Sequence, residues 1–234
     1  MPSFSVVIAA YNECTTLKQV FERCLAVVVQ CTDDFEIIIL DDASTDSTAD
    51  VAEEIRGAHT DIVKVLSHSV NRGIAVTFEE LYRAAVKDYI FDVPADGEFP
   101  PEALLEMLPL LEECDVVICN RTFKKYTTYR RVVSYLYRRL PEILFGVELY
   151  DPGSTKCRAR CVIEDISVTS KSVFVEAERL IRASRRGYRI GKVDVSPERR
   201  IAGDPQGAQF SNVIGAGIDL IRLWVQLVLL RRSP

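Results

Sequence analysis

Acidic side chains follow three apolar segments of this 234-residue chain. Glu13 comes after VVIAAYN, Asp42 ends FEIIILDD, and Asp96 and Glu98 come just after YIFDVP. Carboxylates that lie close together repel one another unless a cation or several hydrogen-bond donors lie among them. A hard divalent cation, Mg²⁺ or Mn²⁺, commonly uses one or two carboxylates and completes its shell with phosphate oxygens of a substrate. The pattern therefore favours a metal-bound phosphate ligand.

Basic residues are concentrated in the second half of the chain, within 121–139 and 179–200. Guanidinium groups such as those of Arg121 and Arg200 can bind two phosphate oxygens at once. A ligand with a metal-bound diphosphate and a second phosphate would use both the acidic and the basic segments. The net charge of −5 and this separation of signs argue against nucleic-acid binding.

Several other chemistries lack their sequence signatures. No GxGxxG follows the first apolar segment, and the chain contains neither GxxxxGK[ST] nor GxSxG, which argues against dinucleotide binding, P-loop hydrolysis and α/β-hydrolase chemistry. His59 and His68 have no metal-ligand spacing, so zinc catalysis is not expected, and His68 is assigned no role.

The elements that must position these groups alternate along the chain. Apolar segments predict strands at 4–10, 35–42, 62–68, 88–94 and 115–119, with helical patterns between them, including one over 100–113. Strands that are apolar throughout are typical of a mostly parallel α/β sheet with helices on both faces. Ligands of such sheets bind beyond the carboxyl ends of the strands, where the acidic residues lie. After Asn120 we expect two more helices and a strand over YRIGKVDVS.

The length suits one α/β domain, expected at 1–208, followed by an amphipathic helix at 209–234. In that helix Asp219, Arg222 and Gln226 form a narrow polar stripe, which argues against a membrane span. Two alternatives stay open: a helix lying at a membrane surface, with basic residues at 231–232 meeting anionic headgroups, and a docking or dimer helix.

Cysteine usage and the first residues bear on location. The seven cysteines form no CxxC pair, and MPSFSVVIAAYNE has neither a basic region nor a cleavage site. We therefore expect a cytoplasmic protein, either free or peripheral at the inner face of the membrane.

Four motifs occur in the order VVIAAYNE, IIILDDASTDST, NRG and PADGEFPPE. They resemble the opening strand, the VDDGS-x-D-x-T segment, the N-x-G turn and the DAD-G-Q-x-x-P-E segment of the inverting family 2 glycosyltransferases of GT-A fold. Within that family the chain resembles the dolichyl- and polyprenyl-phosphate sugar transferases. Pro94 replaces the first aspartate of the usual pair, and Glu98 stands where the family has glutamine.

The resemblance implies a single Rossmann-like GT-A domain that binds a sugar nucleotide, UDP- or GDP-linked. Asp42 would read the base or its ribose, and Asp96 would hold the divalent metal on the diphosphate, with Glu98 assisting. The residues expected around the nucleotide are Ala10, Tyr11, Glu13, Asp42 and Asp96.

On the acceptor side, the resemblance implies that a group of basic and polar side chains holds a phosphate. Arg200 would close on the donor diphosphate, and Asp151 matches an aspartate-containing segment of the family. The residues expected at the acceptor phosphate are Arg121, Arg130 or Arg131, and Ser134.

The implied reaction is one in-line displacement that moves a hexose to polyprenyl phosphate with inversion. A phosphate monoester is already anionic and needs no strong base; a hydroxyl acceptor would need one, with Asp151 and Glu176 as candidates. Two alternatives stay open: the same fold acting on a glycan or small-molecule hydroxyl, and a catalytically silent nucleotide-sugar binding module. The sequence leaves the oligomeric state open.

Overall fold

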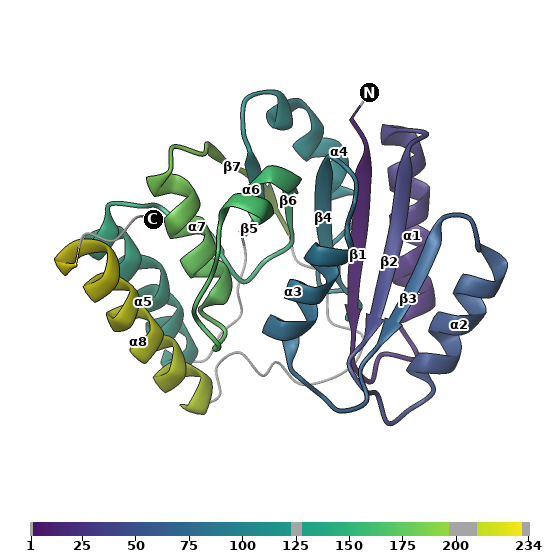
Figure 1. The fold of residues 1–234 in the computed structure, drawn as a ribbon, viewed down its shortest axis with the longest axis horizontal. Coiled ribbons are helices and arrows are strands. Elements are labelled where there is room, and N and C mark those ends of the chain that lie inside the picture. Colours follow the sequence, from purple (N-terminus) through teal and green to yellow (C-terminus); the bar gives the residue numbers. More distant parts are fainter. Residues whose placement is uncertain (1, 123–127, 197–209, 231–234) are drawn as a thin grey trace.

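The computed structural model describes residues 2–122, 128–196 and 210–230, which form an α/β fold around a central sheet (Figure 1). The sheet has seven strands in the order β3-β2-β1-β4-β6-β5-β7. Its neighbouring strands are parallel except where β6 pairs with β4 and with β5. The prediction of a mostly parallel sheet is therefore confirmed. The strands are β1 (Phe4–Ala10), β2 (Phe35–Asp41), β3 (Val63–Ser67), β4 (Tyr89–Pro94), β5 (Val116–Arg121), β6 (Lys156–Ala159) and β7 (Ile190–Val195).

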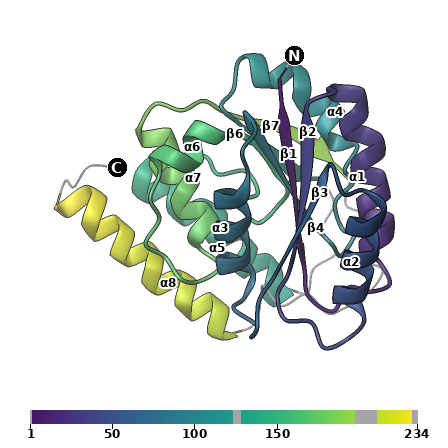
Figure 2. The ribbon, with the colours of Figure 1, turned by 45° about the vertical axis from the view of Figure 1, so that its right-hand side comes forward.

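Helices cover both faces of the sheet. The packing clusters assign α1, α2 and α4 to one face and α3, α6, α7 and α8 to the other. The helices are α1 (Leu17–Cys31), α2 (Thr48–Ala58), α3 (Ile74–Ala84), α4 (Ala103–Met107), α5 (Thr128–Phe145), α6 (Arg160–Asp165), α7 (Val175–Arg185) and α8 (Phe210–Trp224). Helix α8 contacts α5 and lies at the end of the molecule opposite α2 (Figures 1 and 2).

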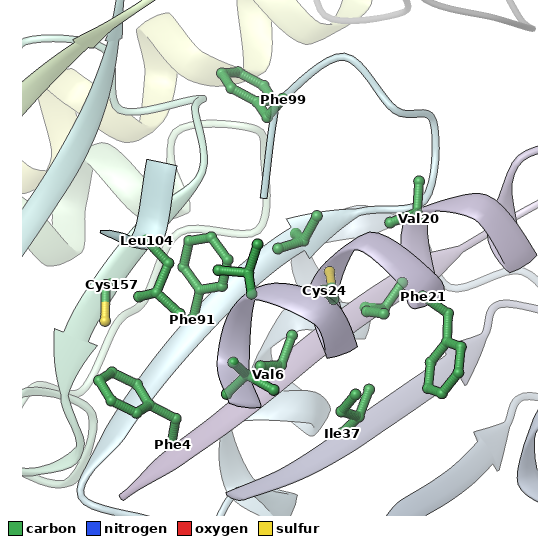
Figure 3. Packing of buried hydrophobic residues seen from close by; sticks show 14 of the residues in the cluster. Phe4, Val6, Val20, Phe21, Cys24, Ile37, Phe91, Phe99, Leu104 and Cys157 are labelled. Carbon is green, nitrogen blue, oxygen red and sulfur yellow. The ribbon is translucent and has the colours of Figure 1, made fainter. Parts of the chain in front are cut away.

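The largest hydrophobic cluster lies between the sheet and α1, α2 and α4. Val20, Phe21 and Cys24 of α1 follow one another at helical spacing and pack toward Val6 of β1 and Ile37 of β2 (Figure 3). Because alternate residues of a strand point to opposite faces, Val7 and Ile38 instead belong to the cluster under α3. Burial on both faces explains why these strands are apolar throughout.

One local expectation was wrong, and one strand was missed. The segment 100–113 is not one helix, because α4 ends at Met107 and a 3-10 helix, η1 (Leu108–Glu112), continues the chain. Pro109 has no N–H to donate to the carbonyl of Leu105, and its ring would clash with that group. Strand β6 was not expected, because in KCRA charged residues alternate with small apolar ones and do not form an apolar run.

Two members of the polar stripe of the C-terminal helix, Asp219 and Gln226, face the protein, whereas Arg222 is exposed. Asp219 is buried and accepts a hydrogen bond from Ser172 Oγ at 2.7 Å, while Arg182 Nη2 donates to Gln226 Oε1 at 3.2 Å. Leu220, Leu223 and Leu227 are buried in the cluster formed with α7. The exposed side carries Ile214, Ile218 and Ile221, which are 48%, 53% and 63% exposed. Among the described helices, none has the length and apolar character needed to cross a membrane.

Candidate active site

The carboxyl ends of the parallel strands β1, β2, β4 and β5 lie at one edge of the sheet. Ala10, Asp42, Asp96 and Arg121 come from the ends of these strands or from just beyond them. Strand β6 runs in the opposite direction, so the segment before it, which contains Asp151, reaches the same edge. The edge therefore gathers residues predicted for both the donor and the acceptor.

The loops after β1 and β2 are joined by hydrogen bonds. The N–H of Asp42 donates to the Ala10 carbonyl at 2.9 Å. Asn12, with φ 56°, accepts a hydrogen bond on Oδ1 from the N–H of Thr45 at 2.8 Å and donates its own N–H to Ser44 Oγ at 2.9 Å. These bonds fix the rim of the site from which Tyr11 projects, 41% exposed.

Glu13 is bonded at the start of α1. Its N–H donates to Thr48 Oγ1 at 2.8 Å, and its Oε2 accepts from Thr16 Oγ1 at 2.8 Å. Glu13 therefore ties α1 to the start of α2 at the edge where it was predicted to line the nucleotide.

Asp42 is buried and joins the end of β2 to the NRG turn. Its Oδ1 accepts from the N–H of Arg72 at 2.8 Å, and its Oδ2 accepts from the N–H of Gly73 at 2.8 Å. Gly73 has φ 81°, a conformation that glycine adopts without strain. Oδ1 also lies 2.6 Å from Nδ1 of His68, which follows β3.

Asp96 and Glu98 form a tight turn after β4. Oδ1 of Asp96 accepts from the N–H of Glu98 at 2.9 Å, and Gly97 between them has φ 69°. Asp96 is 6% exposed. Pro94 is the last residue of β4 and is in register with Ala9 of β1, so it leaves the strand end in place.

Arg121 connects the two predicted halves of the site. Its Nη1 lies 2.7 Å from Glu98 Oε1, and its Nε and Nη2 lie 2.6 Å and 3.0 Å from the two carboxylate oxygens of Asp151. The guanidinium carbon is 5.2 Å from the centre of the Phe99 ring. Arg121 is thus held in a fixed orientation by two carboxylates and an aromatic face.

The acidic residues suit a divalent ion that also binds a diphosphate. Across 2–122, 128–196 and 210–230, no three His, Cys, Asp or Glu side chains converge as a complete metal site. Asp96 and Glu98 supply hard carboxylate oxygens from the same turn, and one or two carboxylates are the donor set expected when substrate phosphates complete the shell. The residues present therefore fit Mg²⁺ or Mn²⁺ bound together with a nucleoside diphosphate.

The remaining predicted residues are described less fully. Ser134 lies half-buried on α5. Arg130 and Arg131 belong to the same helix, but their side chains lie outside the described part of the structure, and so does the whole of Arg200.

The sequence analysis missed a buried ionic cluster between β4, β6, α3 and α7. Arg158 Nη2 lies 2.6 Å from Asp92 Oδ1 and 3.0 Å from Glu176 Oε2, and it packs over the ring of Tyr82. Lys156 Nζ lies 3.5 Å from Glu176. The signal was an aspartate within the apolar strand YIFDVP, because a buried carboxylate needs a partner. We call Asp92, Lys156, Arg158, Glu176, Arg179 and Glu79 the buried ionic cluster.

Glu176, expected as a base for a hydroxyl acceptor, belongs to this buried ionic cluster. Burial alone would raise the pKa of its carboxyl group, but the charges of Arg158 and Lys156 outweigh burial and hold that pKa below its ordinary value. Glu176 is therefore an ionised partner of interior cations.

Comparison with known proteins places the sequence. The family described as "Glycosyl transferase family 2" matches residues 5–174. The chain is 25% identical to an undecaprenyl-phosphate mannosyltransferase of Micrococcus luteus, over 93% of this chain and 92% of that protein. It is 26% identical to an undecaprenyl-phosphate 4-deoxy-4-formamido-L-arabinose transferase of Proteus mirabilis, covering 93% of this chain and 66% of that protein.

Solved structures share the fold. Glucosyl-3-phosphoglycerate synthase of Mycobacterium tuberculosis, in complex with Mn²⁺, UDP and phosphoglyceric acid, aligns with a TM-score of 0.73 at 21% identity, over 95% of this chain and 78% of that one. The mannosyltransferase PcManGT of Pyrobaculum calidifontis, in complex with GDP-Man and Mn²⁺, aligns with a TM-score of 0.66 at 16% identity, over 100% of this chain and 66% of that one.

Proposed function

The chain belongs to glycosyl transferase family 2, and we propose that it moves a hexose from a UDP- or GDP-linked donor to polyprenyl phosphate with inversion. The observation that carries the proposal is the position of Arg121, held between Glu98 and Asp151 at the carboxyl-end edge of the sheet. A guanidinium so oriented suits an acceptor phosphate placed next to the donor diphosphate. The Micrococcus luteus relative, named for transfer to undecaprenyl phosphate, supports this acceptor class.

On the donor side, Ala10, Tyr11, Glu13 and Asp42 surround the nucleotide in this proposal. Their loops are joined by the hydrogen bonds between the ends of β1 and β2, so the pocket is pre-organised before the donor binds.

Asp96 and Glu98 would hold the divalent ion. Arg200, which is not among the described residues, would close on the diphosphate. When bound, the ion neutralises charge on the departing nucleoside diphosphate. Glu98 also keeps Arg121 directed toward the same edge.

The transfer step is a single displacement. A phosphate oxygen of the acceptor forms the new bond to the anomeric carbon, and the bond from that carbon to the diphosphate oxygen breaks with its electron pair leaving on the nucleoside diphosphate. Because the acceptor phosphate is ionised at neutral pH, no residue has to remove a proton. Asp151 then acts on Arg121, whose Nε and Nη2 it binds, and positions the acceptor phosphate together with Arg130 or Arg131 and Ser134.

A lipid acceptor requires access to a membrane surface, and we place this contact on α8 and α5. Ile214, Ile218 and Ile221 are exposed along one side of α8, and Arg222 beside them is 56% exposed at its side chain. On the contacting helix α5, Leu140 and Ile143 are also exposed. Exposed apolar residues combined with arginine suit a surface of anionic lipid.

Transfer can be measured with UDP-glucose and GDP-mannose as donors and undecaprenyl phosphate in detergent micelles, with Mn²⁺ or with EDTA. At least one donor should label the lipid, and EDTA should abolish labelling. Arg121→Gln should raise the KM for undecaprenyl phosphate about tenfold or more, whereas Arg56→Gln, on the exposed side of α2, should behave as wild type. Labelling of hydroxyl acceptors alone, or donor binding without turnover, would replace the proposal with one of the two alternative functions.

Membrane contact is tested by cosedimentation with vesicles containing phosphatidylglycerol. Ile218→Ser combined with Ile221→Ser should weaken sedimentation severalfold, because the two apolar side chains that would enter the lipid are replaced by polar ones. Val29→Ser removes a comparably exposed apolar residue from α1 and should sediment as wild type. Equal sedimentation of all three proteins would remove α8 from the proposal.

A further inference from the structure

The ring of His68 is clamped between two carboxylates. Nδ1 lies 2.6 Å from Asp42 Oδ1, and Nε2 lies 2.9 Å from Glu80 Oε2 on α3. The His68 side chain is only 6% exposed, so water offers little alternative bonding. His68 therefore contacts Asp42, the residue predicted to read the base or the ribose.

The two contacts require a particular protonation state. A neutral imidazole carries one N–H and one lone pair, so it can donate to Asp42 or to Glu80 but not to both. The imidazolium form donates to both at once. When His68 loses its proton, one ring nitrogen therefore presents a lone pair to a carboxylate, and the ring or that carboxylate has to move.

The surrounding charges favour the imidazolium. Burial lowers the pKa of His68, but hydrogen bonds and charge interactions with Asp42 and Glu80 outweigh burial and raise it above the ordinary value. A further charged group next to this pair is Arg72, whose side chain forms an ion pair with Glu80. The neighbouring Asp41 is turned away and accepts from Ser44.

We propose that His68 is a positioning residue for nucleotide recognition: its imidazolium fixes the Asp42 carboxylate in the nucleotide pocket, so nucleotide affinity falls when His68 loses its proton. This inference rests on the proposed function, because it takes Asp42 as part of the donor site. The NRG turn shares the dependence, since Asp42 also accepts the N–H groups of Arg72 and Gly73.

The direction of the pH effect follows from the sign of the shift. Below the folded-state pKa, His68 is charged and Asp42 is held by His68 and the turn together. As the pH rises through that pKa, either Asp42 loses its donor or the ring loses its anchor at Glu80, and in both cases the Asp42 carboxylate is held less firmly. Nucleotide binding should thus be tightest at the acid end of the neutral range and weaken toward pH 8.5.

The first test measures the binding of UDP and of GDP, each with Mg²⁺, by isothermal titration calorimetry between pH 6.5 and 8.5. For the nucleotide that binds, we expect wild-type Kd to rise about tenfold across this range, the effect of about one charge-assisted hydrogen bond. His68→Phe should bind weakly, with Kd independent of pH apart from the nucleotide's own titration.

Glu80→Gln provides the discriminating variant. With an amide at position 80, the neutral ring can donate Nδ1–H to Asp42 while Nε2 accepts from the amide, so both contacts survive deprotonation. This variant should keep the affinity that wild type has at pH 6.5 throughout the range. The matched control is His59→Gln. The ring of His59 lies at a tilt against the ring of Phe21, away from this site, so the variant should keep the wild-type pH profile.

Proton NMR gives a readout independent of affinity. The chain has two histidines, so the His68 and His59 ring signals are separated by comparing wild type with His59→Gln. Saturating nucleotide should raise the pKa of His68, since binding and protonation are linked reciprocally.

The outcomes distinguish a failure of the proposed donor site from a failure of the role proposed for His68. If neither nucleotide binds wild type at any pH, the donor site of the proposed function fails and the inference falls with it. If a nucleotide binds wild type and His68→Phe equally well at every pH, or if it leaves the His68 pKa unchanged, the inference alone is overturned. A loss of thermal stability in His68→Phe with unchanged nucleotide affinity would make His68 a purely structural residue.

Discussion

The carboxyl-end edge of the sheet and the buried ionic cluster both gather charged side chains, but they hold them differently. At the edge, Asp42 and Asp96 accept backbone N–H groups from the turns that follow their strands, while Glu98 and Asp151 share the one guanidinium of Arg121. In the buried ionic cluster, each acidic side chain lies against arginine or lysine. Its three acidic and three basic members balance in charge.

This difference separates a ligand site from a structural one. Charges that neutralise one another in the interior hold the secondary-structure elements together, and removal of one leaves another unpaired. Carboxylates fixed by backbone dipoles keep their negative charge and can bind a cation that arrives with a substrate. The partners of the charged side chains thus distinguish a ligand site from a structural cluster better than the number of charges does.

The largest effect on stability should come from Arg158→Met. This change removes the partner of Asp92 and Glu176 in the interior, and the free energy of unfolding should fall by about 3–5 kcal/mol. Urea denaturation followed by circular dichroism measures it. Asp92→Asn combined with Arg158→Met should cost less than the sum of the two single changes, and strict additivity would argue against coupling inside the cluster.

At the edge, Asp96→Asn should lower sugar transfer strongly and stability only slightly. Sugar transfer should fall by about 10²–10³-fold because the amide binds the divalent ion poorly. The free energy of unfolding should change by less than about 1 kcal/mol, since the asparagine oxygen can still accept the N–H of Glu98. Initial rates of lipid labelling and urea midpoints together test this, and a stability loss as large as that of Arg158→Met would place Asp96 with the structural charges.

A smaller, pH-dependent effect is expected for Glu178, a fully buried acid of α7 outside both groups. Burial raises its pKa, but hydrogen bonds from Ser170, Thr169 and Arg182 outweigh burial and lower it. Its contribution is therefore present above the unfolded-state pKa and is lost as the pH falls through the folded-state value.

Glu178→Gln should reduce the free energy of unfolding by about 1–3 kcal/mol at pH 7. The difference in unfolding free energy from wild type should begin to narrow as the pH falls below the unfolded-state pKa of glutamate, about 4.3, and should close as the pH falls through the lowered folded-state pKa. Urea midpoints at pH 7 and at lower pH give the comparison. A gap that stays constant with pH would show that the ionised form of Glu178 contributes nothing.

The apolar strands and the residues at their ends were the predictable part. Strands buried on both faces appear in the sequence as continuous apolar runs, so β1, β2 and β4 and the acids that follow them were located before the structure. The family and the mostly parallel sheet are confirmed. The roles of the site residues stay predictions.

The unpredicted part depends on long-range pairing. Lys156 and Arg158 look like surface residues in the sequence, and only the pairing of β6 with β4 brings them to Asp92 in the interior. His68 likewise has no local signal, because its two carboxylate partners come from the loop after β2 and from α3. Such contacts follow from topology, which hydrophobic periodicity does not encode.

The reversal of β6 has a consequence for how substrate preference could diversify. Apart from Arg200, the predicted donor residues lie at or just after the ends of β1, β2 and β4. The predicted acceptor residues come from the chain after residue 120, across the antiparallel junction of β4 with β6. A change of length in the segment 146–155, which precedes β6, would reshape the acceptor side and leave the β1–β2–β4 ladder intact. The acceptor side of the site can therefore change in sequence and length while the strands that carry the donor side keep their pairing.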